Sequence, residues 1–95
     1  LQLMEHARSL LAGSRYEPYF LPHLGHSVGI NSHEWPVIEP QVDSALVLEE
    51  NMVFTIEPGI YLPGFGGVRI EDEVLITSDG YEILTGLREE GLELI

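Results

Sequence analysis

The apolar positions near the start of the chain predict one amphipathic helix over residues 2–12. They recur at the spacing of a helical turn and so share one face: Leu3, Met4, Ala7, Leu10 and Leu11. Gly13 follows directly and is a typical residue for ending a helix. We therefore expect a short helix whose apolar face packs against the rest of the domain.

The next part of the chain, residues 14–40, has no regular hydrophobic period. Prolines and aromatic residues predict an irregular approach to a buried region up to residue 24. Residues 25–40 hold two glycines, two histidines and two prolines, which favour loops with short extended pieces. Residues 41–51 are expected to form a surface connection that ends in a turn at the sequence LEEN.

The last part of the chain predicts three strands that pair antiparallel. Residues 52–61 are rich in sheet formers, and the strand that they form is expected to end near Pro58 and Gly59. Glycine and proline in residues 62–67 predict a turn, and residues 66–77 then form the return strand. A second turn at residues 78–80 leads into a third strand, at residues 81–85.

The return strand carries three adjacent carboxylates, at residues 71–73, among its sheet formers. If the hairpin is centred on Gly64, residues at equal distances from it face each other. Glu57 then lies opposite Glu71, and like charges in that position destabilise a sheet. A divalent cation held between the two carboxylates would remove the repulsion.

Two alternatives to a cation site remain open from the hairpin alone. Both glutamates could point into water, with Arg69 on the same face screening them. A bulge in the turn would also shift the pairing by one residue and separate the two carboxylates.

Composition restricts the classes of function. The 95 residues contain 16 acidic and 4 basic side chains, a formal net charge of -12, which argues against nucleic acid and anionic membranes as partners. There is no cysteine, so no disulfide or thiolate metal site is expected, which is consistent with a cytoplasmic location. The chain begins with Leu1 rather than methionine and is expected to be part of a longer protein.

Three histidines strengthen the case for a site. His23, His26 and His33 lie in one loop-rich stretch, where Gly25 and Gly29 allow close approach of the backbone. A single histidine is more often a core or surface residue. Three of them, together with the downstream glutamates, favour a metal or catalytic site. His6, on the predicted helix, is expected to be a surface residue.

Three stretches in this order resemble a known family: GHSVGINSHEWP, FTIEPGIY and GGVRIEDEVLIT. They are similar to the C-terminal half of the pita-bread metallopeptidases over about residues 20–85, and most similar to the Xaa-Pro hydrolases, prolidase and aminopeptidase P. Methionine aminopeptidases share the first two stretches but lack GGVRIED, so Arg69 favours the Xaa-Pro branch. The implied fold is α+β, the second half of a pita-bread domain, with antiparallel strands backed by a helix. Residues 1–95 would be the C-terminal part of the catalytic domain, without its first half and the separate N-terminal domain.

The resemblance also implies a dinuclear metal centre, with Mn or Co expected first and Zn or Fe as alternatives. By motif position His26, Glu57 and Glu71 are the metal ligands, with Glu71 bridging the two ions. Glu57 would also shuttle the proton. The family's two aspartate ligands lie upstream of the matched region, and no aspartate precedes Asp43 here.

Further residues are assigned to the substrate by the same resemblance. His33 would contact substrate and stabilise the tetrahedral intermediate, and Arg69 matches an arginine beside the ligands. The family often has a histidine four residues before the metal histidine, where this chain has Pro22, so His23 is the nearest candidate for that role. Aromatic side chains could form a proline pocket or belong to the core: Trp35, Tyr61 and Phe65.

The implied function is metal-dependent hydrolysis of Xaa-Pro bonds in proline-containing peptides by a complete, homodimeric protein, with this chain alone inactive. Alternatives are a non-catalytic interaction module of the same fold, or an enzyme similar to methionine aminopeptidase. A non-catalytic relative is expected to lose metal ligands, whereas all three matched ligands are present in this chain.

Overall fold

The computed structural model describes residues 2–40 and 46–86, and all structural statements concern these residues. Most of the expected surface connection is outside them, as are residues 87–95. The turn at LEEN is present, and Asn51 in it has a positive φ of 71°. Among the described helices, none is long and apolar enough to cross a membrane.

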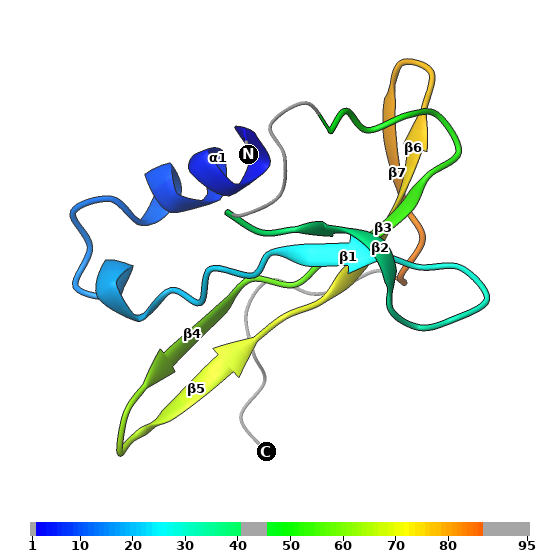
Figure 1. Ribbon diagram of the computed structural model, residues 1–95. Coiled ribbons are helices and arrows are strands. Elements are labelled where there is room, and N and C mark those ends of the chain that lie inside the picture. The colour runs from blue at the N-terminus through cyan, green and yellow to red at the C-terminus, as the bar shows by residue number, and fades with distance from the viewer. Residues whose placement is uncertain (1, 41–45, 87–95) are drawn as a thin grey trace.

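The described residues form two short helices and seven strands, which make two antiparallel sheets (Figure 1). The larger sheet has the order β2-β1-β3-β6-β7, and the smaller one pairs β4 with β5. The helices are α1 (Gln2–Leu11) and the 3-10 helix η1 (Glu17–Tyr19). The strands are β1 (Gly25–Ser27), β2 (Glu34–Ile38), β3 (Val53–Ile56), β4 (Gly59–Leu62), β5 (Gly66–Arg69), β6 (Asp72–Thr77) and β7 (Gly80–Ile83).

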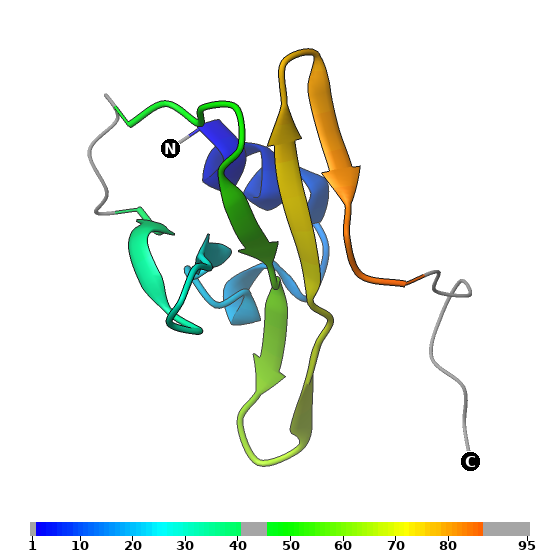
Figure 2. The same cartoon turned by 90° about the vertical axis from the view of Figure 1, so that its right-hand side faces the viewer.

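Helix α1 confirms the first prediction and lies behind β3 and β6 in the view of Figure 2. Gly13, two residues beyond its last residue, has a φ of 77°, which glycine adopts without steric cost. The buried core consists of four side chains from the helix, the segment before β1, and strands β2 and β3: Met4, Leu24, Ile38 and Phe54. The helix thus fixes one face of the sheet through a small number of apolar contacts.

Strands β3 and β4 pair with β6 and β5 in one long hairpin, called the ribbon below. Its predicted register is confirmed at both ends. In the larger sheet Thr55 pairs with Glu73, and in the smaller sheet Gly59 pairs with Arg69. Both pairs are equidistant from Gly64, which has a φ of 76° in the turn. The register is the same on both sides of residues 57 and 71, so the alternative with a bulge in the turn is wrong.

The return strand that the sequence predicts over residues 66–77 is divided in the structure, whereas the strand before it stops near Pro58 as predicted and the chain then continues as β4. Residues 57–58 separate β3 from β4, and residues 70–71 separate β5 from β6. Pro58 has no N–H to donate to a ladder, and the N–H of Glu57 donates to the carbonyl of Leu24, 2.7 Å away, instead of to the return strand. The ribbon therefore opens at the two glutamates.

The two faces of this ribbon differ in chemistry. Even-numbered apolar side chains of the strands and of the link between β5 and β6 share one face beside α1 and line a groove of about 840 Å³: Phe54, Ile56, Ile60, Val68, Ile70, Val74 and Ile76. Odd-numbered positions, including Thr55, Glu57, Glu71 and Glu73, belong to the opposite face by strand alternation. Glu71 and Glu73 of the return segment therefore lie on the face opposite the apolar groove.

Candidate metal centre

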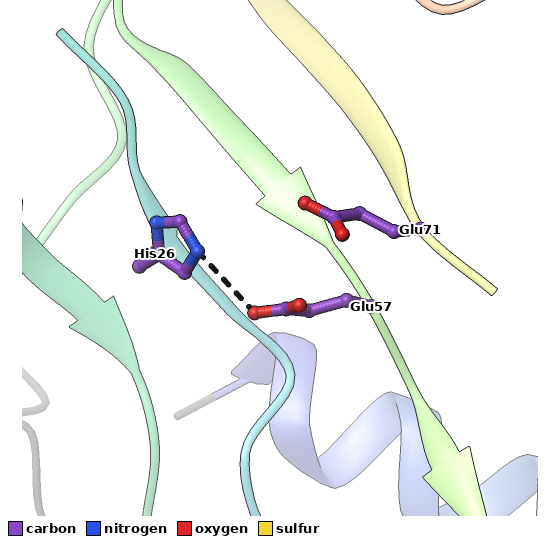
Figure 3. Close-up of side chains that lie close together, drawn as sticks. All are labelled: His26, Glu57 and Glu71. Atoms are coloured by element: carbon purple, nitrogen blue, oxygen red, sulfur yellow. Dashed lines mark ion pairs between the residues drawn. The ribbon is translucent and has the colours of Figure 1, made fainter. Parts of the chain in front are cut away.

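Three candidate ligands meet where the ribbon opens. One nitrogen of His26 and one carboxylate oxygen each from Glu57 and Glu71 all lie within 4.8 Å of one another. Figure 3 shows the three side chains pointing toward a common space from β1, from the end of β3 and from the segment before β6. His26 and Glu57 are buried, whereas Glu71 is exposed, so the cluster is open on one side.

The His26 ring is oriented so that Nε2 faces the carboxylates. Its Nδ1 lies 3.0 Å from the carbonyl oxygen of Ser27. Because a carbonyl only accepts, Nδ1 must carry the hydrogen, and the neutral ring then has its lone pair on Nε2. That nitrogen is 3.4 Å from Oε1 of Glu57. With the ring neutral, two electron-pair donors face each other there, and a cation between them would satisfy both.

The backbone around His26 is held close to β3. The Oγ1 atom of Thr55, a residue that is 1% exposed, accepts the backbone N–H of His26 at 3.1 Å. A Cβ at Gly25 would lie 1.8 Å from the carbonyl oxygen of Thr55, so only glycine permits this approach. Gly25 therefore lets the backbone beside the candidate ligand His26 pack closely against β3.

His23 is in contact with two carboxylates. Its Nε2 lies 3.0 Å from Oε1 of Glu57, and its Nδ1 lies 2.7 Å from Oε1 of Glu39. Glu39 follows β2 directly and was not among the residues predicted from the sequence. No motif marks it, because it reaches His23 only through the pairing of β1 with β2.

His33 lies at the exposed edge of the cluster. Its ring centroid is 4.4 Å from that of His26, with the rings inclined at 39°. Its Nδ1 is 3.2 Å from Oγ of Ser32, and the residue is exposed. His33 is therefore beside the candidate ligand set and exposed among the described residues.

Arg69 lies at the end of β5, with its guanidinium carbon 5.6 Å from the centroid of the Tyr61 ring. A Cβ at Gly59 would lie 2.6 Å from the Tyr61 ring and 3.2 Å from Nε of Arg69, so this glycine gives both side chains room. Tyr61, Trp35 and Phe65 are 41%, 69% and 90% exposed, so none of them belongs to the core of the described residues.

The types of side chain in the cluster agree with the family that the chain matches. The sequence pattern of metallopeptidase family M24 matches residues 2–78, more than half of the chain. The chain belongs to metallopeptidase family M24. The M24 chain contains His26, Glu57 and Glu71 within the matched range, and this mixture of imidazole and carboxylate donors is suited to a divalent cation.

Relatives of the M24 chain include enzymes of the Xaa-Pro type. It is 54% identical to an Xaa-Pro dipeptidase of Pyrococcus furiosus over 84 residues, which are 88% of the chain and 24% of that protein. The solved prolidase from Pyrococcus furiosus superposes with a TM-score of 0.83 at 49% identity, over 93% of this chain and 26% of that one. An X-Pro aminopeptidase from Thermotoga maritima gives 0.82 at 45% identity, over 92% and 24%.

These structural matches confirm the expected fold class, antiparallel sheets with a helix as in the second half of a pita-bread domain. The M24 chain spans about a quarter of the length of the relatives it matches.

Proposed function

We propose that the complete protein hydrolyses Xaa-Pro peptide bonds with the aid of two divalent cations. The observation that carries this proposal is the convergence of His26, Glu57 and Glu71 within 4.8 Å at the opening of the ribbon. The identity of about half the residues to an Xaa-Pro dipeptidase supports the substrate class. Relatives described as dipeptidase and as aminopeptidase both match, so the length of the peptide beyond the proline is left open.

In this proposal His26 and Glu57 would hold one cation, and Glu71 would serve as a ligand for both cations. The remaining ligands are the two aspartates expected from the preceding part of the catalytic domain. Mn or Co is proposed first, with Zn or Fe as alternatives, because all four accept mixed imidazole and carboxylate ligands. Such a pair of cations, when bound, polarises the scissile carbonyl and makes water a stronger nucleophile.

The side chains of the chain supply the proton transfer and substrate contacts. Glu57 takes the proton of the attacking water and delivers it to the leaving nitrogen of proline. His33, exposed beside His26, donates a hydrogen bond to the oxygen that becomes negative in the transition state. Tyr61, Trp35 and Phe65 are exposed aromatic side chains that are available for a proline ring.

The domain assignment is part of the same proposal. We take residues 1–95 as the C-terminal part of the catalytic domain, with its first half and the N-terminal domain supplied by the rest of the protein. The apolar groove supports this, because several of its lining side chains are substantially exposed: Leu10, Val68, Tyr81 and Ile83. A homodimer and a cytoplasmic location complete the proposal.

Metal removal tests the proposal directly. Dialysis of the complete protein against a chelator should abolish hydrolysis of an Xaa-Pro dipeptide, and adding Mn or Co should restore it. Turnover and metal content by elemental analysis are measured together, with an untreated sample as the control. Full turnover by protein that elemental analysis shows to be metal-free would refute the metal-dependent mechanism.

The 95-residue chain alone should not hydrolyse Xaa-Pro peptides. It is expected to lack two of five ligands, so it cannot hold both cations in the required geometry. Turnover of an Xaa-Pro dipeptide by the purified chain is compared with that of the complete protein at equal molar concentration and with added Mn or Co. A metal-dependent rate near that of the complete protein would show that the missing ligands are not required.

A further inference from the structure

His23 and Glu39 form an unexpected connection to the candidate ligand Glu57. The three side chains come from the segment before β1, the residue after β2 and the residue after β3. His23 lies between the carboxylates, with nitrogen–oxygen distances of 2.7 Å to Glu39 and 3.0 Å to Glu57. The side chains become less exposed along this connection, from 37% for Glu39 to 27% for His23 and 10% for Glu57.

The oxygen that His23 contacts is the one turned toward the candidate cation. Oε1 of Glu57 is 3.0 Å from Nε2 of His23 and 3.4 Å from Nε2 of His26. Oε1 of Glu57 therefore contacts both the ring of His23 and the candidate ligand His26. Side chains that hydrogen-bond to a metal ligand orient that ligand without touching the metal, and their removal weakens metal binding.

Glu57 requires such support because it lies outside the strands. Residues 57–58 belong to neither β3 nor β4, so no strand pairing restrains the backbone at that point, although its N–H donates to Leu24. A glutamate side chain has several rotatable bonds, and ordering them costs conformational entropy. A contact that holds the carboxylate before the cation binds removes part of this cost from the binding step.

We infer that His23 and Glu39 are positioning residues for Glu57. Glu39 holds the His23 ring through Nδ1, and Nε2 of His23 directs Oε1 of Glu57 toward the site shared with His26 and Glu71. The inference rests on the proposed metal centre and gives His23 a role different from a direct substrate contact. Both ring nitrogens of His23 already have carboxylate partners within the chain.

The test separates the two ring nitrogens by substitution in the complete protein. In His23→Gln the side-chain amide nitrogen occupies roughly the place of Nε2, so it can still donate to Glu57. In His23→Asn the amide nitrogen is nearer the place of Nδ1 and cannot. Affinity for Co(II) or Mn(II) is measured by calorimetry on metal-free protein, and the visible absorption of bound Co(II) reports ligand geometry.

We expect His23→Ala and His23→Asn to weaken metal binding roughly 10–100-fold, the usual effect of losing a group behind a ligand. His23→Gln should stay much closer to the unsubstituted protein, and Glu39→Ala should have a smaller effect than His23→Ala. Glu50→Ala, which removes an exposed carboxylate in the turn before β3, is the control for Glu39→Ala and should leave affinity and absorption unchanged. Thermal unfolding of each metal-free variant identifies loss of fold.

The outcomes distinguish this inference from the metal centre itself. If the unsubstituted protein binds no metal, the proposed centre is wrong and the inference fails with it. If metal binds and His26→Ala abolishes binding while His23→Ala has no effect, only the positioning role is overturned. Equal weakening by His23→Gln and His23→Asn, with equally lowered unfolding temperatures, would also overturn it, because packing alone would then explain both.

Discussion

Glu57→Gln is expected to reduce turnover of an Xaa-Pro dipeptide by the complete protein at least roughly 10²–10⁴-fold, the contribution typical of a proton-transfer group. Glutamine keeps the size and shape of the buried side chain, so the fold should be retained. It has no negative charge to offer a cation and cannot accept a proton at neutral pH. Turnover, metal content and thermal unfolding are measured on the same preparation.

The matched control for this variant is Glu50→Gln. Glu50 is an exposed residue in the turn before β3, and the same chemical change there should leave turnover unchanged. A Glu57→Gln protein that keeps turnover within a few-fold of the unsubstituted protein would show that Glu57 neither transfers the proton nor holds an essential cation. Equal losses in both variants would point to general electrostatics.

The sequence was sufficient to predict the hairpin because its turn is defined by local chemistry. Glycine and proline place the turn at Gly64, and strand pairing then follows from equal distances along the chain. The structure has this register on both sides of the ribbon opening, with Thr55 opposite Glu73. The relation between Glu57 and Glu71 could therefore be predicted from spacing alone.

The opening of the ribbon was not predicted, because its cause is a contact between distant parts of the chain. Sheet-forming residues continue up to Glu57, and only Pro58 hints at an interruption. The backbone N–H of Glu57 donates to Leu24, more than thirty positions earlier in the chain. Local propensity contains no information about that partner, so the return strand was predicted as continuous where the structure divides it into β5 and β6.

In the candidate site, too, residues within local motifs could be predicted, whereas a residue brought in by contacts between distant parts of the chain could not. His26, Glu57 and Glu71 lie in motifs that the sequence displays directly, and the structure brings them together. Glu39 lies outside the motifs that marked those residues, and its relation to His23 depends on the irregular pairing of β1 with β2. Residues that support a site are harder to predict than its ligands, because any polar side chain at the right place can serve.

Glu71→Gln should lower turnover by the complete protein far more than Glu73→Gln. Both substitutions remove one negative charge, two positions apart on the same face of the ribbon. Burial alone would rank them in the opposite order, since Glu71 is exposed and Glu73 is partly buried. The proposed site ranks Glu71 first, because its carboxylate belongs to the cluster with His26 and Glu57, whereas Glu73 pairs with Thr55 in the sheet.

The expected loss for Glu71→Gln exceeds the roughly 10–100-fold typical of residues behind the ligands, because a bridging carboxylate uses both oxygens and its charge. An amide offers one oxygen and no charge, so one of the two cations should be lost as well. Elemental analysis counts the metals bound to each variant, and turnover of an Xaa-Pro dipeptide is measured in parallel. Since Glu73 stands next to the cluster without belonging to it, Glu73→Gln should retain both metals and nearly full turnover. Two bound metals and unchanged turnover in Glu71→Gln would mean that Glu71 is not the bridge, and that its position beside Glu57 follows from the hairpin register alone.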